Sequence, residues 1–111
     1  NVKNIILSKQ LVKSDTYSRV LELAKQKKIK LIYVEAGSVL KIGDVKITFL
    51  HPQKEQIIEN AMNNNSIVFK LEYNSFSMLF TGDIEKEAED LILSEKLNVN
   101  ADILKVAHHR F

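Results

Sequence analysis

Cysteine is absent from this 111-residue chain, which excludes disulfide bonds, thiolate metal sites and cysteine nucleophiles. Proline occurs once and glycine three times, so the chain is neither collagen-like nor a flexible linker. No apolar run approaches the roughly 20 residues that a membrane span needs. No glycine opens a phosphate-binding GxxxxGK loop. Imidazole is scarce as well, since the three histidines are His51, His108 and His109.

The length and the charge balance bound the remaining possibilities. At 12.7 kDa, residues 1–111 suffice for one domain but not for two. Hydrophobic residues make up 45% of the chain, which is ordinary for a globular protein. The 16 basic residues against 14 acidic ones give a net charge of +2, far too balanced to argue for nucleic acid.

Apolar periodicity predicts a mixed α/β chain whose middle strands are antiparallel. Ser14 or Asp15 is the expected N-cap of the first helix. Gly43-Asp44 is typical of a tight hairpin connection. A single sheet with two helices would bury one sheet face and leave the other to be covered. Strands are expected at 3–7, 30–34, 39–42, 45–50, 67–73, 76–80 and 102–107, and helices at 16–27 and 84–92, with one helical turn before the loop signal at 63–65.

A glycine and a carboxylate follow the apolar strand at 76–80. Asp83 therefore stands at the carboxyl end of a strand, where α/β folds place many of their sites. The same residue is well placed to cap the following helix, with Glu85 and Glu87 favouring the positive helix pole. This segment alone favours the cap over a ligand.

The last predicted strand runs into His108 and His109. Neighbouring side chains on an extended backbone point to opposite faces, so one metal would not take both imidazoles. One could ligate a metal while the other moves a proton or holds a substrate oxygen. The alternative is that one of them is packed or solvated and merely ends the strand. A helix fills the interval between Asp83 and this pair, so a crossover could bring the two strand ends together.

Two further features have structural interpretations. His51-Pro52 closes a strand, and we interpret it as structural. The lysine-rich segment 25–30 could touch phosphates, but a solvated helix end is the simpler interpretation.

Three segments in this order, NSIVFKLEY (65–73), FSMLFTGDIEKEAE (76–89) and ADILKVAHH (101–109), resemble the metallo-β-lactamase-fold hydrolases. Within that family they are similar to the ComEC-type competence proteins, whose hydrolase domain is joined to a membrane channel for DNA uptake. The resemblance implies the second half of an αββα sandwich. It also implies two metal ions, usually zinc and sometimes manganese, bridged by Asp83 and bound by His109. His108 would then be the catalytic residue facing a substrate phosphate, and Asn65 would line the substrate site.

The HxHxDH motif that defines this family is absent from the chain. We therefore expect a fragment of a phosphodiesterase or nuclease domain that alone binds metal weakly and has no substantial hydrolase activity. Its apolar sheet face should be covered by self-association or by repacked helices. The resemblance further implies a DNA or phosphodiester substrate, a membrane channel in the same polypeptide, and an extracytoplasmic or alternatively cytoplasmic location. Alternatives are a stand-alone hydrolase acting on another ester and a degenerate binding or scaffold domain.

Overall fold

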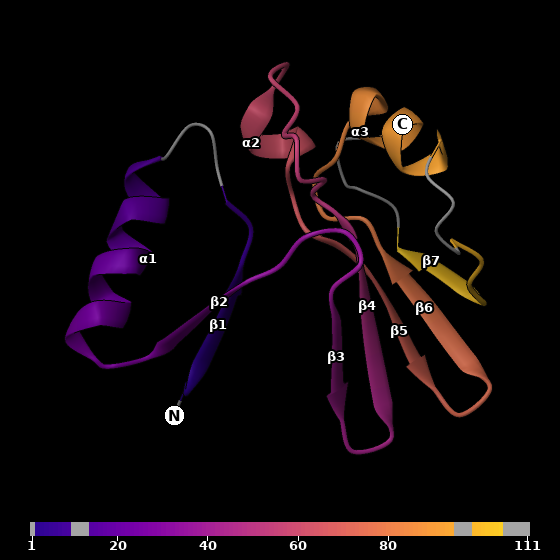
Figure 1. The fold of residues 1–111 in the computed structure, drawn as a ribbon, viewed down its shortest axis with the longest axis horizontal. Helices are drawn as coiled ribbons and strands as arrows, with labels where there is room; N and C mark the ends of the chain where they lie inside the picture. Colours follow the sequence, from indigo (N-terminus) through magenta and orange to yellow (C-terminus); the bar gives the residue numbers. More distant parts are fainter. Residues whose placement is uncertain (1, 10–13, 95–98, 106–111) are drawn as a thin grey trace.

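The computed structural model describes residues 2–9, 14–94 and 99–105 (Figure 1). The mixed α+β class is confirmed, and the predicted helices and strands are present with small shifts at their ends. In chain order the elements are β1 (Asn4–Leu7), α1 (Asp15–Gln26), β2 (Lys30–Tyr33), β3 (Val39–Ile42), β4 (Val45–His51), α2 (Ala61–Asn64), β5 (Val68–Tyr73), β6 (Phe76–Phe80), α3 (Lys86–Ser94) and β7 (Ile103–Lys105).

The N-cap of α1 is Ser14, one of the two residues that the sequence predicted for this position. Its backbone is extended, and its hydroxyl oxygen accepts a hydrogen bond from the backbone N–H of Tyr17 at 3.0 Å. This bond satisfies one of the N–H groups that the first helical turn leaves without a partner.

The strands form two sheets rather than one. β1 and β2 pair in parallel, and β3 to β7 form a five-stranded sheet in chain order, antiparallel except for the parallel pair β6–β7. The chain leaves the first sheet after β2, where the N–H groups of Ala36 and Gly37 bond to the carbonyls of Pro52 and Phe49. These bonds lead the chain to the edge of the second sheet.

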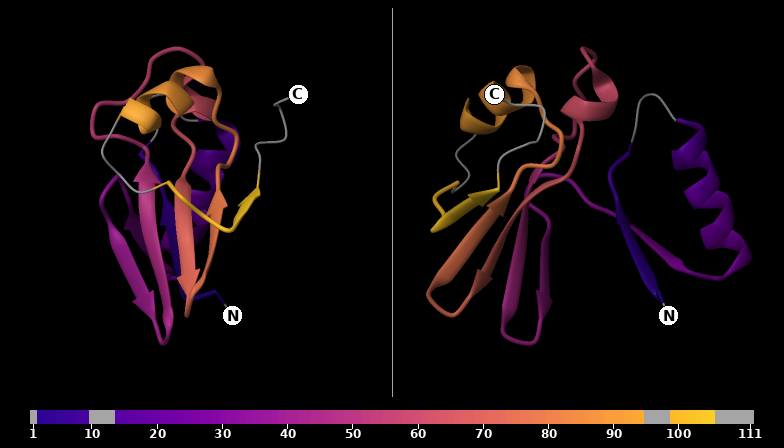
Figure 2. Two further views of the ribbon diagram at one scale, coloured as in Figure 1. Left: turned by 90° about the vertical axis from the view of Figure 1, so that its right-hand side faces the viewer. Right: turned by 180° about the vertical axis from the view of Figure 1, so that it is seen from behind.

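A helix lies beside each of the two sheets. Figures 1 and 2 show α1 beside the two-stranded sheet and α3 at the upper end of the five-stranded sheet. Ile6 of β1 and the β4–β5 residues Ile47, Phe49 and Phe69 line one apolar pocket of about 220 Å³ between the sheets. Phe69 also stacks on Phe80, with ring centroids 4.7 Å apart.

The main core lies between α3 and the five-stranded sheet. Ile84, Ala88 and Ile92 are buried, as their helical spacing predicted, and they pack against Leu50 and Val68. These two strand residues alternate with Phe49 and Phe69, whose side chains point to the opposite face. Both faces of the sheet are therefore apolar near its upper end in Figure 1.

The face toward β1–β2 stays partly open at the hairpin ends. Ile42, Tyr73 and Phe76 belong to one row across β3 to β6 and expose 61%, 47% and 44% of their surface. Covering of this face by self-association stays a prediction. In the part of the chain that the structure describes, no helix is long and apolar enough to cross a membrane.

Candidate functional site

Two of the sequence motifs meet at the upper end of the five-stranded sheet. Gly82, in the turn after β6, lies against Ser66 and Ile67, just before β5. A Cβ atom at Gly82 would stand 3.0 Å from the Ile67 carbonyl oxygen and 3.0 Å from Ser66 Cβ. Gly82 also has φ +58, a left-handed conformation that favours glycine. Both the space and the backbone angle therefore require glycine in this turn.

The third motif lies beside the same turn. β6 and β7 are parallel neighbours, with Phe80 opposite Lys105, and the hydroxyl of Thr81 donates a hydrogen bond to the Lys105 carbonyl at 2.8 Å. The crossover through α3 therefore brings the two strand ends together, as predicted. His108 and His109 follow β7 but lie outside the described residues, so their roles stay predictions.

Asp83 lies in this turn. The interpretation of Asp83 as the N-cap of α3 is wrong, because the helix begins further along the chain. The helix begins at Lys86, and its first backbone bond runs from the Glu89 N–H to the Glu85 carbonyl at 3.0 Å. Glu85 therefore stands at the N-cap. The apolar spacing marked Ile84 as part of the helix because its side chain is buried with the helical face, although its backbone is still in the turn.

Asn64 joins this turn to α2. Its side-chain oxygen accepts a hydrogen bond from the Glu85 N–H at 2.9 Å. Its amide nitrogen donates to a Glu87 carboxylate oxygen at 2.9 Å and to the Glu59 carbonyl at 2.8 Å. The Asn64 side chain is fully buried, so these bonds replace water at every polar atom of the amide. Asn64 thus fixes the start of α3 relative to the loop before β5.

Asn60 and Asn63 strengthen the same connection. Their amide nitrogens donate to the two carboxylate oxygens of Glu85, at 2.9 and 3.1 Å. The sequence marked Asn63-Asn64-Asn65 only as a loop signal, and Glu85 and Glu87 only as charges near a helix pole. The structure shows that these two groups bind each other.

Asn65, expected to line a substrate site, is held inside the loop that precedes it. Its side-chain oxygen accepts from the Ile57 N–H at 3.0 Å. Its amide nitrogen donates to the carbonyls of Ile57 and Ala61, at 2.9 and 2.8 Å. The side chain has no exposed surface. These bonds give Asn65 a structural task, and contact with a substrate stays a prediction.

His51 lies beneath this network at the end of β4. Its Nε2 is 2.6 Å from the Asn64 carbonyl oxygen. A carbonyl only accepts hydrogen bonds, so Nε2 carries the proton and Nδ1 is the bare nitrogen. Nδ1 is buried with no hydrogen-bond partner. Burial lowers the pKa of His51 below its ordinary value of 6.5, and the bond to Asn64 opposes that shift in part.

A metal centre needs several His, Asp or Glu side chains directed at one point. Among residues 2–9, 14–94 and 99–105, no three His, Asp or Glu side chains are placed to hold a metal ion together. The carboxylates of Glu85 and Glu87 accept hydrogen bonds from asparagine amides instead. The described residues by themselves therefore do not fit a metal centre, and the predicted His108 and His109 lie outside them.

The chain is similar in sequence to a segment of a known protein. No family model matches this chain. The chain is 33% identical to ComE operon protein 3 of Bacillus subtilis (strain 168) over 108 residues, which is 97% of this chain. It spans 14% of the length of that relative. The similarity therefore concerns one segment of a much longer protein.

Proposed function

We propose that this chain forms part of the hydrolase domain of a competence-type DNA-uptake protein. The observation that carries the proposal is the similarity to ComE operon protein 3, which extends over 97% of the chain. The three motifs that resemble ComEC-type proteins support it, because they come from separate parts of the sequence and their described residues include three neighbouring strands of one sheet, β5, β6 and β7. In the whole protein, this segment would accompany a membrane channel and act on incoming DNA at the extracytoplasmic side.

The layer order is consistent with the second half of an αββα sandwich. α1 lies beside one sheet and α3 packs at the upper end of the other, and the open apolar row at Ile42, Tyr73 and Phe76 would be covered by the rest of the domain. In this proposal Asp83 and His109 would bind zinc or manganese together with ligands from outside this chain. His108 would face the phosphodiester. The isolated chain would then have no substantial hydrolase activity.

The first experiment measures the isolated chain. The purified protein is incubated with Zn²⁺ or Mn²⁺, its metal content is measured by mass spectrometry, and turnover is followed with bis(p-nitrophenyl) phosphate. We expect less than stoichiometric metal after dialysis and no turnover above a buffer control. Stoichiometric retained zinc with turnover, both lost in Asp83→Asn, would show a stand-alone hydrolase instead.

The second experiment places the chain in a competent cell. The matching segment of Bacillus subtilis ComE operon protein 3 is replaced by this chain, and transformation frequency is measured together with the amount of chimera in the membrane fraction. We expect transformation above that of a deletion strain, and a loss of at least tenfold for Asp83→Asn at unchanged protein level. A chimera that is present in normal amount but gives no transformation above the deletion contradicts the proposal.

A further inference from the structure

Charge is distributed unevenly along the sequence. Residues 1–50 contain ten Lys or Arg residues against four Asp or Glu, whereas residues 51–111 contain six against ten. The near-neutral total therefore hides a basic first half and an acidic second half. Such asymmetry is typical of proteins that bind a polyanion with one part of their surface.

Five lysines of the basic half gather where α1 ends and β2 begins. Backbone hydrogen bonds hold the segments that carry them together. The Lys28 N–H donates to the Lys25 carbonyl at 3.4 Å, and the Lys30 N–H donates to the Lys3 carbonyl, just before β1, at 3.1 Å. All five side chains are exposed. We call the group the basic cluster; it consists of Lys3, Lys25, Lys27, Lys28 and Lys30.

The basic cluster has more lysines than the favourable interaction with the negative end of α1 explains. The negative pole of a helix attracts cations within its last turn, and Lys25 lies there. The other four lysines lie beyond the helix. Within the described residues no carboxylate forms an ion pair with any of the five, and the one ion pair on α1 joins Arg19 and Glu22. Their like charges therefore repel one another without internal compensation.

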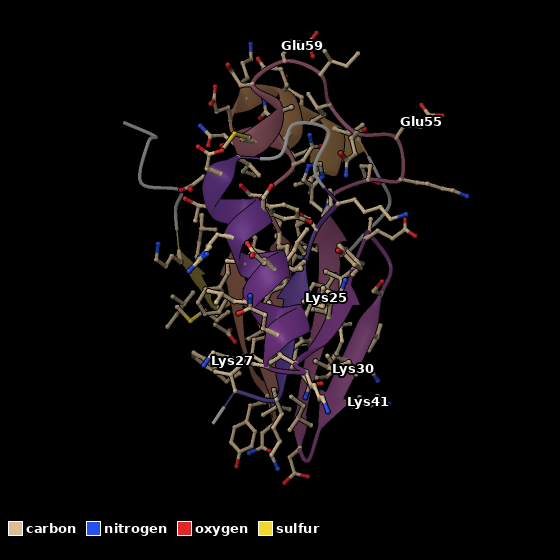
Figure 3. All side chains as sticks on the ribbon, turned by 90° about the vertical axis from the view of Figure 1, so that its left-hand side faces the viewer. Lys25, Lys27, Lys30, Lys41, Glu55 and Glu59 are labelled. Atoms are coloured by element: carbon tan, nitrogen blue, oxygen red, sulfur yellow. The ribbon has the colours of Figure 1, made fainter. Side chains whose placement is uncertain are left out.

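Several glutamates of the acidic half lie at the other end of the molecule. Figure 3 shows Lys25, Lys27 and Lys30 in the lower half of the view, with Glu55 and Glu59 at the opposite end. Glu85 and Glu87 also lie at that upper end, beside α2. A polyanion approaching the molecule is thus attracted at the basic cluster and repelled from the acidic end.

We propose that the basic cluster binds the phosphodiester backbone of DNA without reading its sequence. The choice of DNA as the polyanion rests on the proposed function. Lysine ammonium groups are point charges that pair with phosphates, and base readout would need side chains that reach or stack on bases. The basic cluster contains no aromatic side chain on which a base could stack. An anionic membrane would need exposed apolar side chains next to these lysines. Val2, which precedes Lys3, exposes 64% of its surface, so binding to vesicles is one outcome of the test.

The test measures DNA binding rather than hydrolysis. A fluorescein-labelled 30-base-pair duplex of arbitrary sequence is titrated with the full chain at NaCl concentrations from 20 to 150 mM, and affinity is read from fluorescence anisotropy. The variant Lys27→Gln/Lys30→Gln removes two charges of the cluster. Its matched control, Lys54→Gln/Lys86→Gln, removes two exposed lysines elsewhere. Circular dichroism verifies that both variants are folded.

We expect the plot of log affinity against log salt to lose about two units of slope in the cluster variant, because each phosphate contact contributes about 0.9. The control variant should keep the slope of the parent. Equal losses in the two variants, or no salt-dependent binding of DNA, would overturn the proposal. Binding to vesicles of phosphatidylserine and phosphatidylcholine in place of DNA would overturn it too. This test measures DNA affinity and not turnover. Its outcome therefore does not depend on whether the isolated chain is inactive or the chimera fails to support transformation.

Discussion

The imidazole Nε2 of His51 donates a hydrogen bond to the backbone carbonyl of Asn64, 13 residues later in the chain, at 2.6 Å. This bond fastens the end of β4 to the residue that also holds the Glu85 N–H and the Glu87 carboxylate. His51 is itself fully buried. Order at the candidate site therefore depends on a neutral histidine that does not belong to any of the three motifs.

Stability should fall on acidification because of His51. Its pKa is lowered in the folded protein, so the folded state favours the neutral ring. Above the ordinary pKa of 6.5 both states are neutral, and this contribution is fully present. As the pH falls below that value, the unfolded chain takes up a proton that the folded chain refuses. The unfolding free energy then decreases by up to about 1.4 kcal/mol per pH unit until the folded pKa is reached.

Urea unfolding at pH 8, 7, 6 and 5 measures this effect. The control is His51→Gln, whose amide can donate to the same carbonyl but does not titrate. The variant should be less stable at pH 8 and should lose less stability between pH 7 and 5 than the parent. Parallel pH profiles for the two proteins would show that His51 is not the group responsible.

Replacing Asn64 should destabilise the protein more than replacing its neighbour. Asn64→Ala removes three side-chain hydrogen bonds and leaves the Glu85 N–H without its acceptor, so we expect a loss of about 2–4 kcal/mol. Asn63→Ala removes one bond to a Glu85 carboxylate and should lose about 1 kcal/mol or less. Chemical denaturation of both variants at pH 7.5 gives the comparison. Similar losses would mean that Asn64 does not organise the connection between α2 and α3.

Asn65→Asp should reduce stability without any substrate present. The aspartate keeps an acceptor for the Ile57 N–H but turns a second oxygen toward the carbonyls of Ile57 and Ala61. A buried acceptor facing two acceptors is unfavourable, and we expect a loss of at least about 2 kcal/mol in the thermal or urea unfolding free energy. An unchanged stability would mean that the amide is not needed by the fold, and would favour its predicted contact with a substrate.

Alanine substitutions at two glycines with the same backbone conformation distinguish backbone strain from steric crowding. Gly82 and Gly43 have φ +58 and +56, so an alanine at either position carries the left-handed penalty of about 1–2 kcal/mol. At Gly43 a Cβ atom would meet nothing within 4 Å, whereas at Gly82 it would meet Ile67 and Ser66 at 3.0 Å. Gly82→Ala should therefore lose about 1–3 kcal/mol more than Gly43→Ala in urea unfolding. Equal losses would argue against close contact between the two motifs.

Local signals in the sequence determined the helices, the strands and much of the core. The apolar spacing of Ile84, Ala88 and Ile92 gave the buried face of α3, because helical period and burial are both local properties. The cap of α1 was narrowed to Ser14 or Asp15, because the hydrogen bond that a cap makes spans only three residues. The crossover between β6 and β7 also followed from the order of the elements, because a helix between two strands favours a parallel pair.

Only the tertiary structure decided which polar groups meet. Asn64 binds Glu85 and Glu87 from 21 and 23 residues away, and His51 binds the Asn64 carbonyl from 13 residues away. Periodicity in a sequence reports which side chains are buried, but it does not choose among distant donors and acceptors. The same is true of Gly82, whose need for glycine comes partly from Ser66 and Ile67, just before β5. These partners were set by the packing of α3 and the 57–65 loop on the end of the sheet.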